Sequence, residues 1–425
     1  MSVSPYWELT FDAEGDVNKV QLTRLEQQCA ERGITDLVVF SHGWNNDRSI
    51  ATRLYSRFFA PFPELTRDAG DGVRLGYTGV LWPSMRFTDE PIPDFERSVV
   101  APVEGTEPPP WFDPVTQRVV GAQFPGHDRA VERIRELLDE RPEDPERLAE
   151  FLRLVRHLVP PPPASAAHGF APDMEDEPAA DAPLMLDEAD PRTVFEEFAA
   201  VQEHPTALWD TGQEILRQAT YYAMKRRAGV VGERGLGPAL GRLAKESPGT
   251  RVHLVGHSFG ARLVSFAVKG LPKGVVTVAS LTLLQGAFSH YAFSEKLPHD
   301  KDRGGALRGV QRKVRGPVVA CYSEHDGALR TFYPLASRMA RDSAGLLPGA
   351  ERWGAVGYDG FQAVTGCRRM TLREALEGDF PAEGCVAVDA AAVVRRGGAP
   401  SGAHSDICHP ELARVVLAAG RVPTG

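Results

Sequence analysis

The sequence lacks several features that would assign it to common functional classes. Its 425 residues include only 5 cysteines, which are scattered and show no paired spacing of a metal site or disulfide framework. The first residues have neither a basic start nor an apolar run, so we expect no signal peptide. No stretch approaches the about 18 consecutive apolar residues that a membrane span requires. These absences favour a cytoplasmic protein that binds no metal and crosses no membrane.

Positive charge is also scarce, since 48 Lys and Arg residues stand against 57 Asp and Glu residues and give a net charge of −9. A nucleic-acid partner is therefore not expected. The glycine-rich segment 229–237 lacks the Lys-Ser or Lys-Thr pair of a phosphate-binding loop. We interpret it instead as a break after a helix over residues 207–227. Hydrophobic residues, at 42% of the chain, are sufficient for a large buried core.

The most informative part of the chain is the pentapeptide Gly256-His257-Ser258-Phe259-Gly260. Residues 251–255 before it are apolar and β-branched, which predicts a buried strand, and residues 261–268 after it predict a helix. The two glycines leave room for a sharp turn in which the serine holds a strained backbone. A strand, Gly-x-Ser-x-Gly and a helix in this order resemble the nucleophile elbow of the α/β-hydrolase superfamily.

A second strand-like run, residues 34–40, ends in Ser41-His42-Gly43-Trp44. A His-Gly pair after such a strand is similar to the oxyanion loop of the same superfamily. This resemblance implies that the backbone N–H of Trp44 binds the developing negative charge, with the N–H of Phe259 as the second donor. One of the polar residues 45–47 is expected to cap a helix that begins near Arg48.

The superfamily places an acid and then a histidine after the serine in the chain. Residues 317–323 predict a strand, and the loop after it holds Asp326, followed by a glycine and the start of a helix. Asp326 is therefore the preferred acid. The rivals are Glu324 in the same loop and, as weaker candidates, Asp359 and Asp389.

The last predicted strand covers residues 385–394, and a glycine-rich loop leads from it to His404. Such a loop carries the catalytic histidine in this superfamily, so His404 is the preferred base and His409 is the alternative. His257, beside the serine, is expected to shape the turn rather than act as the base.

Together with Leu81-Trp82-Pro83-Ser84, these motifs make residues 30–85 and 205–420 similar to α/β-hydrolase serine hydrolases, and within them to an uncharacterised bacterial group. The resemblance implies a mostly parallel sheet flanked by helices and a triad of Ser258, Asp326 and His404. It further implies cleavage of a carboxylic ester, a thioester or a lipid acyl bond through an acyl-enzyme, with no cofactor and no metal. A peptidase or amidase with the same triad, and a catalytically silent hydrolase fold that serves as a binding or regulatory module, are the alternatives. The motifs identify no substrate-binding residue.

Residues 87–200 interrupt this core, dividing it into a first part, 1–86, and a second part, 201–425. Apolar residues at helical spacing predict helices over 130–138 and 146–159. The acidic segment 171–190 has no Lys or Arg, which predicts a mobile, disordered loop. We expect the insertion to act as a cap or lid over the active site or to pack on the core, and a partner protein that gates the lid is a further possibility.

Overall fold

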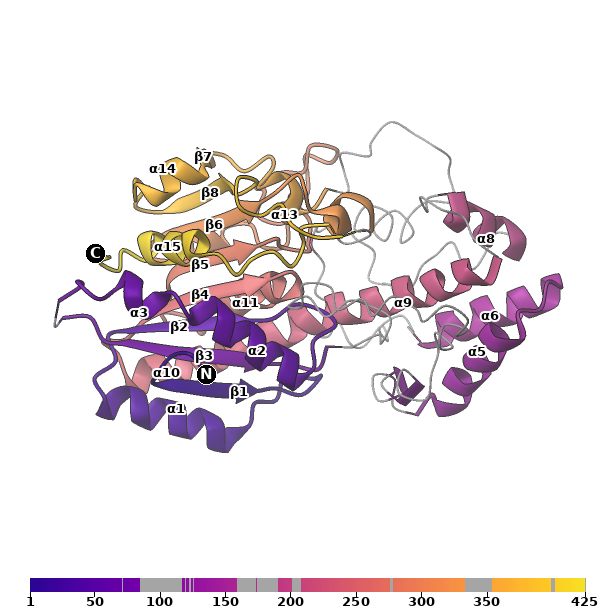
Figure 1. Ribbon diagram of the computed structural model, residues 1–425, viewed down its shortest axis with the longest axis horizontal. Coiled ribbons are helices and arrows are strands. Elements are labelled where there is room, and N and C mark those ends of the chain that lie inside the picture. Colours follow the sequence, from indigo (N-terminus) through magenta and orange to yellow (C-terminus); the bar gives the residue numbers. More distant parts are fainter. Residues whose placement is uncertain are drawn as a thin grey trace, which may run out of the picture.

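The computed structural model describes residues 1–70, 72–84, 117–118, 120–121, 124, 126–158, 173, 190–200, 208–275, 278–332, 354–398 and 402–424. Within these residues the chain forms one 8-stranded sheet in the order β1-β3-β2-β4-β5-β6-β8-β7, and every neighbouring pair of strands is parallel. The α/β architecture expected from the sequence is therefore present (Figure 1). The strands are β1 (Tyr6–Thr10), β2 (Asp36–Ser41), β3 (Leu75–Leu81), β4 (Arg251–His257), β5 (Val278–Leu284), β6 (Pro317–Tyr322), β7 (Arg368–Thr371) and β8 (Gly384–Asp389).

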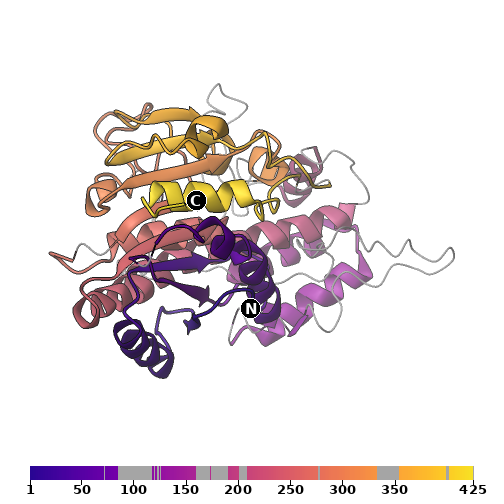
Figure 2. The same cartoon turned by 60° about the vertical axis from the view of Figure 1, so that its left-hand side comes forward.

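Helices cover both faces of the sheet. Along β2, Leu37 and Val39 join one apolar layer, whereas Val38 and Phe40 join the other, as expected for a strand that is buried on both sides. Figure 2 shows the yellow helix α15 lying across one face. The first layer contains α1 (Lys19–Glu31), α10 (Gly237–Glu246) and α11 (Phe259–Lys269), and the second contains α2 (Arg48–Phe59), α3 (Phe62–Leu65), α14 (Leu372–Leu376) and α15 (Pro410–Ala419).

The helices of the insertion pack against one another and against the start of the long helix that follows them. The rings of Phe151, Phe195 and Trp209 lie against each other, with centroids 5.8, 5.3 and 5.6 Å apart. The predicted apolar face of residues 146–159 is thus covered by neighbouring helices, and residue 159 itself lies outside the described residues. The helices of the insertion are α5 (Asp128–Glu140), α6 (Pro145–Leu158) and α8 (Pro191–Ala200). The next helix, α9 (Leu208–Val230), belongs to the second part of the core, and Figure 1 shows it leading from this group to the sheet.

The glycine-rich segment 229–237 does not break the helix, contrary to the expectation from sequence. Helix α9 continues through one π-helical turn, Val231–Leu236, directly into α10. A Cβ atom on Gly232 would lie 2.2 Å from the carbonyl oxygen of Leu263 in α11. The glycine therefore serves close packing between helices rather than a turn.

The acidic segment 171–190 also departs from expectation at one residue. Asp173 is fully buried, and its carbonyl oxygen accepts a hydrogen bond from the N–H of Ala306. Its side chain pairs with two cations of the core, which offsets the cost of burying a charge. Only residues 173 and 190 of this segment are described.

The described helices also bear on the expectation about membranes. None of them combines the length and the apolar character that a bilayer span would need.

Candidate active site

Ser258 lies at the carboxyl end of β4, near the middle of the sheet, and directly precedes α11. Its backbone has φ 56° and ψ −122°, a strained conformation for a residue with a side chain. The N–H of Ser258 donates to the carbonyl of Leu284 (3.1 Å), and its own carbonyl accepts from the N–H of Ala287 (3.2 Å). The segment after β5 therefore holds the serine from both sides of its peptide.

Glycines provide the space that this turn needs. A Cβ atom on Gly256 would lie 2.3 Å from the carbonyl oxygen of Gly260, and one on Gly260 would lie 2.0 Å from that of Ser41. A Cβ atom on Gly43 would lie 2.6 Å from the Cβ of Ser258. The steric requirement predicted for the turn is confirmed, and the loop after β2 lies directly against the serine.

The three residues of the expected triad form one chain of hydrogen bonds. The Oγ of Ser258 and the Nε2 of His404 are 2.9 Å apart, and the Nδ1 of His404 and the Oδ2 of Asp326 are 2.8 Å apart. Because a carboxylate only accepts, Nδ1 carries the proton and Nε2 of the neutral ring accepts from the serine hydroxyl. Asp326 is fully buried, and its Oδ1 accepts from the N–H of Leu329. The acid is thus fixed, and the base lies within reach of the candidate nucleophile.

The loops that carry the acid and the histidine are joined to each other. The N–H of Ala403 donates to the carbonyl of His325 (2.9 Å). Gly402 has φ 57°, and a Cβ atom there would lie 2.5 Å from that same carbonyl oxygen. The glycine before the histidine therefore permits the close approach that aligns Asp326 with His404.

The rival candidates lie outside this chain of hydrogen bonds. Asp359 accepts from the Nδ1 of His290 (2.8 Å), and Asp406 accepts from the Nε2 of His409 (2.8 Å). The other two candidate acids, Glu324 and Asp389, are exposed. Of the candidates considered from sequence, the structure brings together Ser258, His404 and Asp326.

The two predicted oxyanion donors, Trp44 and Phe259, both adjoin Ser258. Phe259 is the first residue of α11, so its N–H has no acceptor within the helix. Trp44 follows Gly43, which lies against the serine. The indole of Trp44 and the ring of Phe259 contact each other and the ring of Tyr221 from α9, with centroids 6.4, 5.9 and 4.7 Å apart. That these N–H groups bind an anion stays a prediction.

The Trp-Pro-Ser motif after β3 braces the loop that holds Trp44. The Oγ of Ser84 accepts from the N–H of Asn46 (3.1 Å) and donates to its carbonyl (2.8 Å). The indole of Trp82 stacks on the ring of His42, and its Nε1–H donates to the carbonyl of His42 (3.0 Å). The motif was recognised in the sequence, but its contacts with the loop after β2 could be seen only in the structure. The cap of α2 is Asp47, one of the three polar residues proposed for it.

Replacing Ser84 with alanine should loosen this loop. The change leaves the N–H and the carbonyl of buried Asn46 without the hydroxyl, which costs about 1–3 kcal/mol of folding free energy. If the N–H of Trp44 binds an oxyanion as predicted, kcat/KM for an activated ester should fall about tenfold, because that N–H loses its fixed position. Ser265→Ala is the control, since Ser265 is also buried, at 0% exposed against 9% for Ser84, but its hydroxyl donates within α11, to the carbonyl of Ala261. An equal loss of kcat/KM in both variants would contradict the bracing of the loop.

His257 has a position that the sequence only partly anticipated. Its Nε2–H donates to the carbonyl oxygen of His404 (2.8 Å), and its Nδ1 is buried with no hydrogen-bond partner. The residue before the serine thus fixes the backbone of the histidine, 147 positions away.

Two buried histidines should make this region sensitive to acid. Burial lowers the pKa of His257 from 6.5 to about 3 and that of His42 from 6.5 to about 4. Below pH 6.5 the unfolded chain takes up these protons and the folded chain does not. The free energy of unfolding should therefore fall with pH, by up to about 1.4 kcal/mol per pH unit for each histidine, until the folded pKa values are reached.

The variant His257→Gln tests this linkage. Denaturant unfolding at a series of pH values below about 6.5 should give a shallower pH dependence in the variant than in the wild type, because one of the two titrations is removed. His157→Gln is the control, since His157 is exposed and lies in the insertion. If His257→Gln and the wild type have parallel stability curves, the acid sensitivity does not come from His257.

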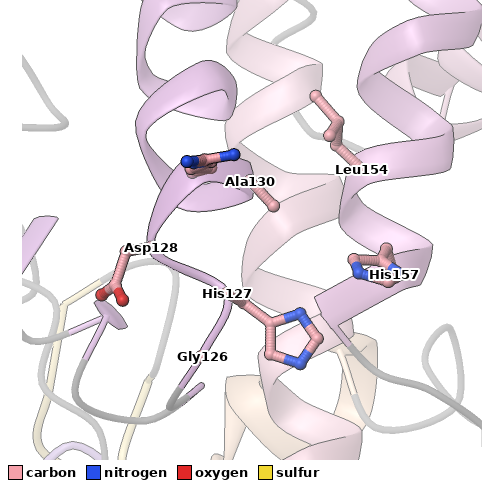
Figure 3. Close-up of a pocket in the computed structure, with 7 residues that line it drawn as sticks. Gly126, His127, Asp128, Ala130, Leu154 and His157 are labelled. Carbon is pink, nitrogen blue, oxygen red and sulfur yellow. The ribbon is translucent and has the colours of Figure 1, made fainter.

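A cavity of about 650 Å³ lies in the insertion, away from Ser258. Figure 3 shows the rings of His127 and His157 next to each other in it, packed edge to face with centroids 4.8 Å apart, while Asp128 points away from both. Ser258, His404 and Asp326 do not line this cavity, so it is separate from their chain of hydrogen bonds. No cluster of three His, Cys, Asp or Glu side chains suited to a metal ion occurs in the described residues.

Comparisons with known proteins found no relative of this chain. No protein-family model, no curated protein and no solved structure matches the chain.

Proposed function

We propose that this protein is a serine hydrolase of the α/β-hydrolase type that cleaves a carboxylic ester, a thioester or a lipid acyl bond. The observation that carries the proposal is the unbroken hydrogen-bond chain from the Ser258 hydroxyl through His404 to the buried carboxylate of Asp326. A serine hydroxyl is a weak nucleophile at neutral pH, and an adjacent, oriented imidazole is the means by which such hydroxyls are activated.

The geometry supports the following sequence of events. The Nε2 of His404 takes the hydroxyl proton as the Oγ of Ser258 attacks the substrate carbonyl. Asp326 holds the proton on Nδ1 and stabilises the imidazolium that forms. The N–H groups of Trp44 and Phe259 stabilise the oxyanion, and His404 then protonates the leaving group. Water, activated by the same imidazole, cleaves the acyl-enzyme.

The fold supports the same assignment by its topology. The candidate nucleophile follows a central parallel strand, and the acid and the histidine follow later strands of the sheet, β6 and β8. Serine, acid and histidine occur in this order in α/β-hydrolases. In this proposal the insertion is the cap of the enzyme, because its helices α6 and α8 pack on α9, and α9 reaches the proposed oxyanion donors through Tyr221.

Labelling with a fluorophosphonate tests the proposal directly. These probes react with activated serines, so the wild type should gain the mass of one adduct, and peptide mapping should place it on Ser258. Competition by esters of increasing acyl length, by thioesters and by amides then ranks the substrate classes. If folded wild-type protein gains no adduct, the proposal is wrong. That result would instead support the alternative of a catalytically silent binding module. Competition by amides alone would point to a peptidase or amidase.

A further inference from the structure

Asp173 is the one described residue between residues 158 and 190, and it lies at the centre of a buried cluster of charges. Its Oδ1 accepts from the Nε of Arg262 (3.0 Å). Its Oδ2 is 2.9 Å from the Nζ of Lys225 and accepts from the N–H of Ser289 (3.1 Å). We call Arg262, Lys225 and the N–H of Ser289 the carboxylate cradle.

The cradle has the chemistry of an anion-binding site. Asp173 and Arg262 have side chains that are 0% exposed, and that of Lys225 is 10% exposed. Burial opposes the charge of Asp173, but Lys225 and Arg262 hold the pKa of this carboxyl below its usual value, so it is ionised. Removing the carboxylate from a buried ion pair lowers the free energy of unfolding strongly, because it leaves the charge of the cation uncompensated. Removing Asp173 therefore takes a carboxylate away from two buried cations at once.

The cradle is connected to the candidate nucleophile by two short routes. Arg262 is the fourth residue of α11, so it lies one helical turn after Ser258. Ser289, which donates to Asp173, lies two residues after Ala287, whose N–H donates to the carbonyl of Ser258. The carboxylate thus touches both segments that fix the strained serine backbone.

We propose that the carboxylate cradle is a binding site for one carboxylate, that the insertion fills it with Asp173, and that filling it positions Ser258 for reaction. This inference rests on the proposed function only for its last part. Asp173 is a positioning residue, because it acts on Ser258 through α11 and through the segment after β5. In this proposal the insertion contributes a residue on which the position of Ser258 depends.

Formate provides a sharp test, because Asp173→Ala removes the atoms of a carboxylate and formate supplies them. We expect Asp173→Ala to melt several degrees below the wild type. Well below its melting temperature, with a native circular dichroism spectrum, it should react with a fluorophosphonate at least about tenfold more slowly, because the serine is misplaced. Sodium formate, compared with sodium chloride at equal ionic strength, should raise both the melting temperature and the labelling rate. Adding Lys225→Met should weaken this rescue.

Asp36 offers a matched control. Its side chain is 1% exposed and pairs with Arg251 and His253, but it lies at the start of β2, at the opposite end of the sheet from Ser258. Asp36→Ala should also lower the melting temperature, yet label at the wild-type rate. A labelling rate that falls equally in both variants would overturn the positioning by Asp173, since loss of stability alone would then explain it.

The remaining outcomes separate this inference from the proposed function. If the wild type does not label, the proposed function fails, while a formate-specific rise in the melting temperature of Asp173→Ala still supports the cradle. If formate changes neither quantity, the cradle is not a carboxylate site. Should Asp173→Ala not fold, Lys225→Met alone replaces it. This variant keeps the pair of Asp173 and Arg262, and an unchanged labelling rate in it overturns the inference.

Discussion

Replacing Ser258 with alanine is expected to lower the turnover of an activated ester by about five to six orders of magnitude. The change removes the oxygen that attacks the carbonyl, and no neighbouring group takes its place in the hydrogen-bond chain, because His404 Nε2 then faces a methyl group. Progress curves with a chromogenic ester and single-turnover acylation both measure this loss.

The fold should survive this substitution. Alanine carries the same Cβ as serine and meets the same strain at φ 56°, so the backbone conformation is no less accessible to it. Among the described residues, the hydroxyl makes one hydrogen bond, to a partly exposed histidine. The melting temperature should therefore change little. Wild-type turnover of the same ester by a folded Ser258→Ala variant would rule out the serine as nucleophile.

The strands of the fold could be read from the sequence because burial on both faces leaves continuous apolar runs. Residues 34–40 and 317–323 are such runs, and β2 and β6 lie there. The strand β7 escaped prediction because three of its four residues are exposed, so it has no apolar run. The predicted strand 385–394 ends early, at Asp389, where apolar residues continue into a turn. Apolar character therefore marks burial more reliably than it marks where a strand ends.

The candidate site could be predicted because its members follow strand ends that a parallel sheet brings to one edge. Ser258 and His404 are 146 positions apart and Asp326 and His404 are 78 apart, yet local motifs singled out all three. The groups that support them could not be predicted. The bonds from His257 to His404 and from Ser84 to Asn46 join loops whose proximity exists only in the folded chain.

Asp173 shows why composition was a poor guide at one residue of the acidic segment 171–190. A run of acids without Lys or Arg argues against order when its partners are sought within the run. The partners of Asp173 are Lys225 and Arg262, which lie 52 and 89 positions further along the chain. A buried ion pair between distant segments leaves no local pattern that could be recognised in advance.

Replacing His404 with alanine should cost about as much activity as replacing Ser258, because nucleophile and base act as a unit. Without the imidazole, the hydroxyl must lose its proton to water or hydroxide, so we expect the residual turnover to rise with pH. Added imidazole should restore part of the activity by occupying the space between Ser258 and Asp326. Initial rates over a pH series, with and without imidazole, measure both effects.

The variant His409→Ala is the control for this prediction. His409 also pairs with an aspartate, Asp406, which raises the pKa of its imidazole. That pair lies at the start of α15, and Asp406 also accepts from the N–H groups of Arg395 and Arg396. Loss of His409 should therefore loosen a loop and leave most of the turnover intact. A variant His409→Ala that is inactive beside an active His404→Ala would mean that the hydrogen-bond chain through His404 is not the path of the proton.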